Sequence, residues 1–230
     1  MRFLWLVAIA LPLVFAIHLG AQTLSDRKAF AAPKRFLALG DSYTIGEGVD
    51  SAQTWPAQLA RAMRAAKITL GDPLIVARTG WTTDELASGI SIAPIDPPYE
   101  LVTLLIGVNN QYRGRSAEKY RAEFVSLLAL ATEFAGGVVT RVVVVSIPDW
   151  GVTPFAEGKD RAKIGAEIDA FNAISREESK KAGARYADIT AISREKHDGW
   201  TVADGLHPSA AQYARWAAVI RDPATSALRK

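Results

Sequence analysis

The 230-residue sequence contains no cysteine, so disulfide bonds, thiolate nucleophiles and zinc–thiolate sites are all excluded. It also lacks internal repeats and low-complexity tracts, which argues against solenoid, fibrous and disordered proteins. The net charge is only +3, and no basic stripe of the kind that binds nucleic acid is present. With 49% hydrophobic and 22% charged residues, the chain has the composition of one globular domain with a sizeable core.

The N-terminal residues have the layout of a secretory signal peptide. Arg2 precedes an apolar run over residues 3–17, which is shorter than the roughly 20 residues that a membrane-spanning helix needs. Cleavage after Ala16 or after Ala21 fits the small residues there. We therefore expect residues 1–21 to be a signal peptide of a secreted or periplasmic protein, with an uncleaved N-terminal membrane anchor as the alternative.

Beyond this segment, short apolar runs alternate with stretches of helical periodicity. The runs predict five strands, at residues 36–39, 74–77, 101–106, 141–147 and 184–188. Because these runs show little polar alternation, the strands are expected to be buried on both faces of a parallel sheet. Helical patterns cover residues 116–134, residues 160–182 and the segment that begins at Ser209.

Strand and helix in alternation predict an α/β fold, a doubly wound sandwich around one sheet. We expect the domain to cover residues 35–222, preceded by a short linker at residues 22–34 and followed by a C-terminal tail at residues 223–230. Ligands of such folds bind at the carboxyl ends of the strands, so the loops that follow the strands are where chemistry is expected.

Two of these loops carry the parts of a serine nucleophile and its base. Gly40-Asp41-Ser42 follows the first strand, and a serine hydroxyl needs a base beside it to become nucleophilic. Histidine suits that task near neutral pH. Asp204 lies three residues before His207, so one tight loop carries both the imidazole and a carboxylate to orient it. His197 lies in a polar stretch and is interpreted as an exposed loop residue.

Two further loops add Gly80, which follows the second strand, and Asn109-Asn110, which follow the third. A metal site is the competing use of aspartate and histidine. No His-x-x-x-His pair and no cluster of carboxylates occurs in the sequence, so neither a metal nor another cofactor is expected.

With these motifs in this order, the sequence resembles the SGNH or GDSL-like hydrolases over nearly the whole domain. The resemblance rests on Gly40-Asp41-Ser42, Gly80, Gly107-Val108-Asn109-Asn110 and Asp204-Gly205-Leu206-His207-Pro208. It implies a flavodoxin-like three-layer α/β/α sandwich with a five-stranded parallel sheet in the order 2-1-3-4-5. It also implies hydrolysis of esters or thioesters through an acyl-serine intermediate.

By the same resemblance, Ser42 is the nucleophile, His207 the base and Asp204 the residue that orients the base. The backbone N–H groups of Ser42 and Gly80 and the side-chain amide of Asn109 form the implied oxyanion hole. The sequence departs from the family pattern at one position. The family usually has Gly-x-Asn-Asp in the third block, and this chain has Asn110 in the last place.

Aromatic residues close to these motifs are candidates for a substrate pocket. Trp81 and Trp150 are the proposed substrate-binding residues, and Tyr43, Tyr112 and Trp200 are further candidates, although each could equally be a core residue. The expected substrate is a small-molecule, carbohydrate or lipid ester: a sugar acetate, a lysophospholipid or a thioester. The alternatives are an acyltransferase that uses the same intermediate and a non-catalytic carbohydrate- or surface-binding module on the same fold.

Overall fold

The computed structural model describes residues 32–195 and 198–229, and their five parallel strands form one sheet in the order β2-β1-β3-β4-β5. The strands are β1 (Lys34–Asp41), β2 (Leu70–Arg78), β3 (Leu101–Leu105), β4 (Val142–Val145) and β5 (Arg185–Ala187). The expected sheet order is confirmed. The predicted signal peptide, most of the predicted linker and His197 lie outside the described residues.

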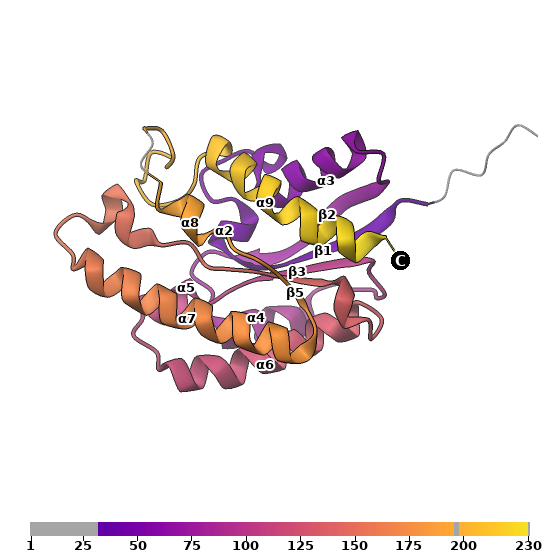
Figure 1. Cartoon of the computed structure of the whole chain (residues 1–230), viewed down its shortest axis with the longest axis horizontal. Helices are drawn as coiled ribbons and strands as arrows, with labels where there is room; N and C mark the ends of the chain where they lie inside the picture. The colour runs from indigo at the N-terminus through magenta and orange to yellow at the C-terminus, as the bar shows by residue number, and fades with distance from the viewer. Residues whose placement is uncertain (1–31, 196–197, 230) are drawn as a thin grey trace, which may run out of the picture. The chain divides into compact units, whose positions relative to one another are not determined.

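Helices cover both faces of the sheet, which gives the three layers (Figure 1). On one face lie α3 (Trp55–Ala65) and α9 (Ala210–Leu228). On the other lie α4 (Thr83–Ile92), α6 (Ala117–Phe134) and α7 (Arg161–Ala182). Three short helices follow strands at the carboxyl edge of the sheet: α2 (Ser42–Ile45), α5 (Val108–Tyr112) and α8 (Thr190–Ser193). Single 3₁₀ turns occur at η1 (Ser51–Gln53), η2 (Val139–Arg141), η3 (Trp150–Val152) and η4 (Pro154–Ala156).

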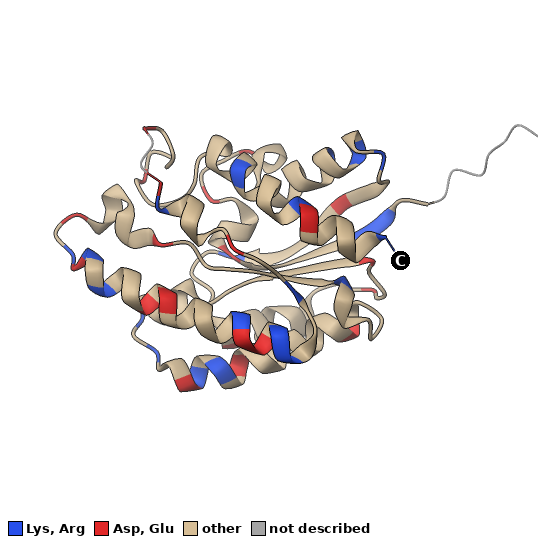
Figure 2. Ribbon diagram, in the orientation of Figure 1, with Lys and Arg blue, Asp and Glu red and all other residues tan. Residues whose placement is uncertain are grey.

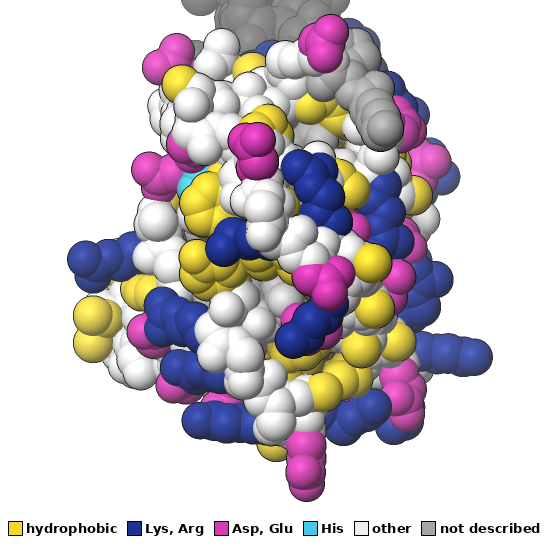
Figure 3. Space-filling model, turned by 90° about the vertical axis from the view of Figure 1, so that its left-hand side faces the viewer, with side chains coloured by type: hydrophobic (Ala, Val, Ile, Leu, Met, Phe, Trp, Pro, Cys, Tyr) yellow, Lys and Arg dark blue, Asp and Glu magenta, His cyan; other side chains and the backbone are white. Residues whose placement is uncertain are grey.

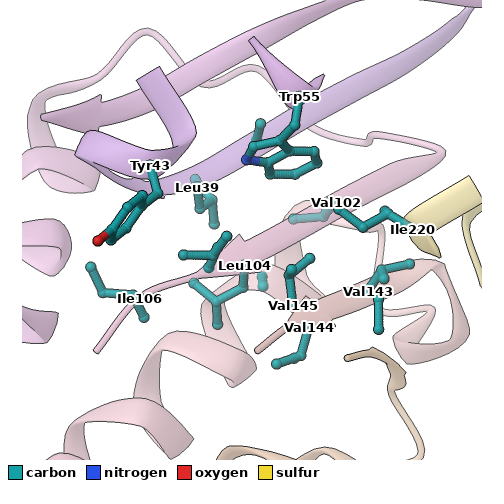
Figure 4. Close-up of a cluster of buried hydrophobic side chains, with 14 of the residues drawn as sticks. Leu39, Tyr43, Trp55, Val102, Leu104, Ile106, Val143, Val144, Val145 and Ile220 are labelled. Carbon is teal, nitrogen blue, oxygen red and sulfur yellow. The ribbon is translucent and has the colours of Figure 1, made fainter. Parts of the chain in front are cut away.

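The two helical layers explain why the strand sequences are so uniformly apolar. Every residue of β3 and β4 is buried, because each strand meets helices on both of its faces. Figure 4 shows side chains of these strands packed among one another and against β1 and α9. Trp55, at the start of α3, is fully buried in the same core.

The predicted helix beginnings are confirmed by their caps. The side chains of Ser116, Asp160 and Ser209 each accept a hydrogen bond from a backbone N–H in the first turn of α6, α7 and α9. Thr82 and Glu85 form a reciprocal capping box at the start of α4. These caps supply partners for N–H groups that the helix itself leaves unbonded.

The largest differences from the predicted boundaries occur at the start of β2 and at the end of the chain. Strand β2 begins at Leu70, not Leu74, and includes Pro73, which an edge strand tolerates because one of its sides has no strand partner. The predicted C-terminal tail is wrong, because α9 continues through Pro223 to Leu228. Ala224 and Leu228 are buried in the core, and this packing keeps the last turns helical.

The outward sides of α6 and α7 carry charges of both signs (Figure 2). Arg121 of α6 pairs with Glu177 of α7 at 2.8 Å, and Lys181 pairs with Glu177 at 2.6 Å. Exposed pairs of this kind contribute little to stability, so they mark a solvated surface rather than a binding site. In the described part of the chain, no helix combines enough length and hydrophobicity to span a lipid bilayer.

Candidate active site

Ser42 stands at the turn between β1 and α2, where the first strand leaves the sheet. The turn is tight, because a Cβ atom at Gly40 would come within 2.2 Å of Thr44 Oγ1 and 2.6 Å of the Leu105 carbonyl oxygen. Only glycine fits there without moving the backbone. Ser42 itself is 4% exposed and lines a pocket at the carboxyl edge of the sheet.

Asp41, beside the nucleophile candidate, is a fully buried carboxyl group. One oxygen, Oδ1, accepts the backbone N–H of Tyr43 at 3.0 Å and thereby caps α2. The other, Oδ2, has no hydrogen-bond partner among the described residues. Because burial disfavours the charged form, the pKa of Asp41 rises from about 3.8 to about 7, although backbone hydrogen bonds oppose the rise.

His207 lies in a closed loop that also contains Asp204. Its Nδ1 atom is 2.6 Å from Oδ2 of Asp204, and Oδ1 of the same carboxylate accepts the backbone N–H groups of Leu206 and His207 at 2.8 and 2.9 Å. The loop is shut by a backbone hydrogen bond from Val202 to His207 at 2.9 Å. The carboxylate therefore fixes both the backbone turn and the direction of the imidazole ring.

The pKa of Asp204 is the net result of opposing influences. Burial raises it, but hydrogen bonds from the His207 ring and from the backbone of Leu206 and His207 outweigh that effect. The pKa of Asp204 thus lies below its ordinary value, and the group is ionised at neutral pH. An ionised carboxylate at this place favours the tautomer of His207 that carries its proton on Nδ1.

Gly80 and Asn109, the predicted oxyanion-hole residues, are held by neighbouring hydrogen bonds. Gly80 has a φ of +81°, which a glycine adopts without the strain that a side chain would bring. Its carbonyl oxygen accepts Nη2 of Arg113 at 2.6 Å. Asn109 donates from Nδ2 to the carbonyl oxygen of Trp81 at 3.0 Å, so the two loops are tied together one residue beyond Gly80.

One pocket, with a volume of about 160 Å³, brings most of the predicted site residues together. Its polar lining comes from Ser42, Thr79, Gly80, Asn109 and His207. Its apolar lining comes from Tyr43, Val108, Tyr112, Trp150, Phe155 and Leu206. Seen towards the carboxyl edge of the sheet, hydrophobic side chains gather beside a histidine (Figure 3). A reactive polar group thus adjoins an apolar compartment, as in sites that bind small organic ligands.

An aromatic wall closes one side of this pocket. The rings of Tyr112 and Trp150 have centroids 5.3 Å apart, and Phe155 lies 6.0 Å from Trp150. The indole N–H of Trp150 donates to Oε1 of Gln111 at 2.7 Å, and Gln111 in turn donates to Glu167 at 2.7 Å. These bonds fix the orientation of Trp150, while Tyr112 and Phe155 remain partly exposed at the rim.

The other predicted substrate-binding residue, Trp81, does not line the pocket. Its ring packs on Gly89 of α4, where a Cβ atom would lie 2.1 Å from the indole. Trp200 also lies outside the pocket lining. Conversely, the sequence did not indicate Phe155, because η4 carries no recognisable motif. Val108 and Leu206 are direct neighbours of predicted site residues, which is the signal that could have identified them.

No group of three or more His, Asp or Glu side chains in residues 32–195 and 198–229 is arranged to hold a metal ion. Among the described residues, the buried Asp41 carboxylate forms no hydrogen bond with another acidic side chain. What the site offers chemically is a hydroxyl, an imidazole with its carboxylate, and hydrogen-bond donors on one small cavity.

Residues 38–215 match the sequence profile of the GDSL-like lipase/acylhydrolase family, and the chain belongs to this family. It is therefore an enzyme of the class that hydrolyses ester bonds, with the five-stranded fold described above. No sequence among curated proteins matches the chain.

Solved structures with the same fold differ widely in sequence. The lipase/acylhydrolase from Enterococcus faecalis is 18% identical with a TM-score of 0.64, covering 82% of this chain and 94% of that one. The psychrotrophic esterase EstA from Pseudoalteromonas sp. is 15% identical with a TM-score of 0.65, covering 86% and 100%. The acetylxylan esterase Axe2 from Geobacillus stearothermophilus is 14% identical with a TM-score of 0.64, covering 86% and 94%. At sequence identities this low, the likeness shows a shared fold and nothing more.

Proposed function

We propose that this enzyme hydrolyses small acyl esters through an acyl-serine intermediate formed on Ser42. The observation that carries the proposal is the shared pocket. Ser42, Gly80, Asn109 and His207 all line it, and Asp204 lies 2.6 Å from the far nitrogen of the His207 ring. These are the parts that nucleophilic catalysis requires: a hydroxyl, a base, a group to orient the base, and donors for the developing charge.

In the first half-reaction, Oγ of Ser42 bonds to the carbonyl carbon of the ester while Nε2 of His207 takes the hydroxyl proton. The carbonyl oxygen becomes an oxyanion and is stabilised by the N–H groups of Ser42 and Gly80 and by the Asn109 amide. The carbon–oxygen bond to the alcohol then breaks, and His207 returns the proton to the departing alcohol. In the second half-reaction, water attacks the acyl-serine by the same steps, which releases the acid and free Ser42.

The pocket favours a short acyl group. Its volume of about 160 Å³ is below the roughly 300–1,000 Å³ typical of pockets for drug-sized ligands. Its lining is largely apolar, with the aromatic wall of Tyr112, Trp150 and Phe155 on one side. We propose carbohydrate O-acetyl groups, lysophospholipids and thioesters as the substrates to compare, with the acetyl esters favoured by the size of the cavity. Acetylxylan esterase activity in a protein of the same fold supports including acetylated sugars.

Ser42→Ala tests the proposal directly. We expect the variant to fold and to lose nearly all hydrolysis of p-nitrophenyl acetate, because the acyl-serine intermediate cannot form without Oγ of Ser42. Ser126→Ala, which removes an exposed hydroxyl from α6, is the matched control and is expected to keep the wild-type rate. A phosphonate that labels wild type and not Ser42→Ala would identify the nucleophile independently. Wild-type rates in Ser42→Ala would rule out the assignment.

We also propose that the enzyme is exported. The support is the sequence of residues 1–21, with Arg2 ahead of a short apolar run. Expression of the full chain followed by mass measurement of the protein outside the cytoplasm tests this. A product that begins near residue 17 or residue 22 supports a cleaved signal peptide. A product of full mass held in the membrane fraction supports the anchor instead.

A further inference from the structure

Asn110, where the family pattern has aspartate, is completely buried and contacts the start of α4. Its Oδ1 atom accepts the backbone N–H of Thr83 at 3.1 Å, and its Nδ2 atom donates to Thr83 Oγ1 at 2.6 Å. The neighbouring Asn109 donates to the carbonyl of Trp81. Two consecutive asparagines of α5 therefore hold the segment that follows Gly80.

A third residue determines which way these hydrogen bonds run. The Thr83 hydroxyl donates to Oε2 of Glu123 on α6, and a hydroxyl has a single proton to give. The partner of Thr83 Oγ1 at position 110 must then be a donor, which the amide of Asn110 is and a carboxylate is not. Glu123 also forms an ion pair with Lys119 at 3.6 Å.

We infer that Asn110, Thr83 and Glu123 form a directed hydrogen-bond chain that positions Gly80 relative to Asn109, and that Glu123 is the reason asparagine stands at position 110. The three residues are positioning residues, because none of them lines the pocket. The inference rests on the proposed function, since the spacing of Gly80 and Asn109 matters only if both bind the oxyanion.

Asn110→Asp, which restores the usual family residue, is therefore expected to harm this enzyme. The new carboxylate can only accept hydrogen bonds, so it competes with Glu123 for the one proton of Thr83. One of the two acceptors loses the proton of Thr83, and two like charges are brought together. In the double variant Asn110→Asp with Glu123→Gln, the direction of the hydrogen bonds is reversed. The amide at position 123 donates to Thr83, and Thr83 donates to the carboxylate at position 110.

The test is the steady-state hydrolysis of p-nitrophenyl acetate, with active enzyme counted by phosphonate titration. We expect Asn110→Asp to lower kcat about tenfold with little change in KM, because misplacing an oxyanion donor affects the transition state more than substrate binding. The double variant is expected to regain most of the lost kcat. Glu123→Gln alone keeps an acceptor oxygen for Thr83 and should stay within about twofold of wild type. Glu133→Gln, an exposed change on the same helix, is the control for lost charge.

Wild-type kcat in Asn110→Asp would overturn the inference, and so would a double variant no better than Asn110→Asp. If Asn110→Asp does not fold, Thr83→Val and Thr83→Ser decide instead. A loss of kcat in Thr83→Val with kcat retained in Thr83→Ser supports the hydrogen-bond chain, whereas equal kcat in both variants overturns the inference. These outcomes are separate from failure of the proposed function, which would show as wild-type rates in Ser42→Ala.

Discussion

The Nδ1 atom of His207 lies 2.6 Å from Oδ2 of Asp204, and the other oxygen of that carboxylate holds the backbone of the same loop. One aspartate thus orients the imidazole twice, through the ring and through the chain that carries it. The contact uses only Nδ1 of the ring, and His207 and Ser42 line the same pocket. The pKa of Asp204 stays below its ordinary value because these hydrogen bonds outweigh its burial.

Asp204→Asn is expected to lower kcat by up to about 10⁴-fold with a much smaller change in KM. The substituted amide keeps the shape of the side chain, but it no longer stabilises the imidazolium and permits the wrong tautomer of His207. Steady-state kinetics on p-nitrophenyl acetate measures the effect, with circular dichroism as the check on folding. A kcat close to that of wild type would show that Asp204 only closes the loop.

Asn109→Ala is expected to reduce kcat by about 10²–10³ and to change KM far less, because an oxyanion donor acts mainly on the transition state. The substitution also releases the carbonyl of Trp81, so thermal melting must be recorded beside the kinetics. Should KM rise while kcat holds, Asn109 would be a substrate-binding residue instead.

Trp150→Ala is expected to widen the pocket and shift acyl preference towards longer chains. The indole forms part of the pocket lining and is fixed by Gln111, so its removal opens space beside Ser42. The measurement is kcat/KM for p-nitrophenyl acetate, butyrate and octanoate, expressed as ratios. Trp81→Ala is the matched control, because its ring packs on Gly89 outside the pocket, and its ratios should stay at wild-type values. Equal ratios in both variants would remove Trp150 from acyl selection.

Asp41→Asn is expected to change the pH dependence of stability. Burial raises the pKa of Asp41 to about 7, whereas the unfolded chain ionises it near 4. Between these values the folded protein binds more protons than the unfolded chain, so the free energy of unfolding falls as pH rises. Asparagine has no such proton, and the stability of the variant relative to wild type should therefore increase from pH 4 to pH 7.

Urea denaturation of both proteins at pH 4.5, 6 and 7.5, followed by tryptophan fluorescence, measures this difference. Asp222→Asn, on an exposed side chain of α9, is the control and should show a constant offset. A constant offset for Asp41→Asn as well would mean that Asp41 is ionised in the folded protein over the whole range.

Much of the fold could be predicted because its signals are local. The apolar runs of β3 and β4, and the caps at Ser116, Asp160 and Ser209, depend on residues close together in the chain. Strand β2 was predicted too short and the end of α9 too early. Proline usually interrupts a strand or a helix, and Pro73 and Pro223 lie at these two places. An edge strand and a buried helix end tolerated them.

The sequence by itself determined the candidates for the chemistry: a serine hydroxyl, an imidazole, and a carboxylate three residues from the imidazole. Only the tertiary structure decided which aromatic residues form the pocket, because Trp81 and Trp150 both follow a predicted strand but pack on different elements. It also brought Asn110, Thr83 and Glu123 together from α5, α4 and α6. Hydrogen-bond direction depends on every group within reach, and that set exists only once the helices have packed.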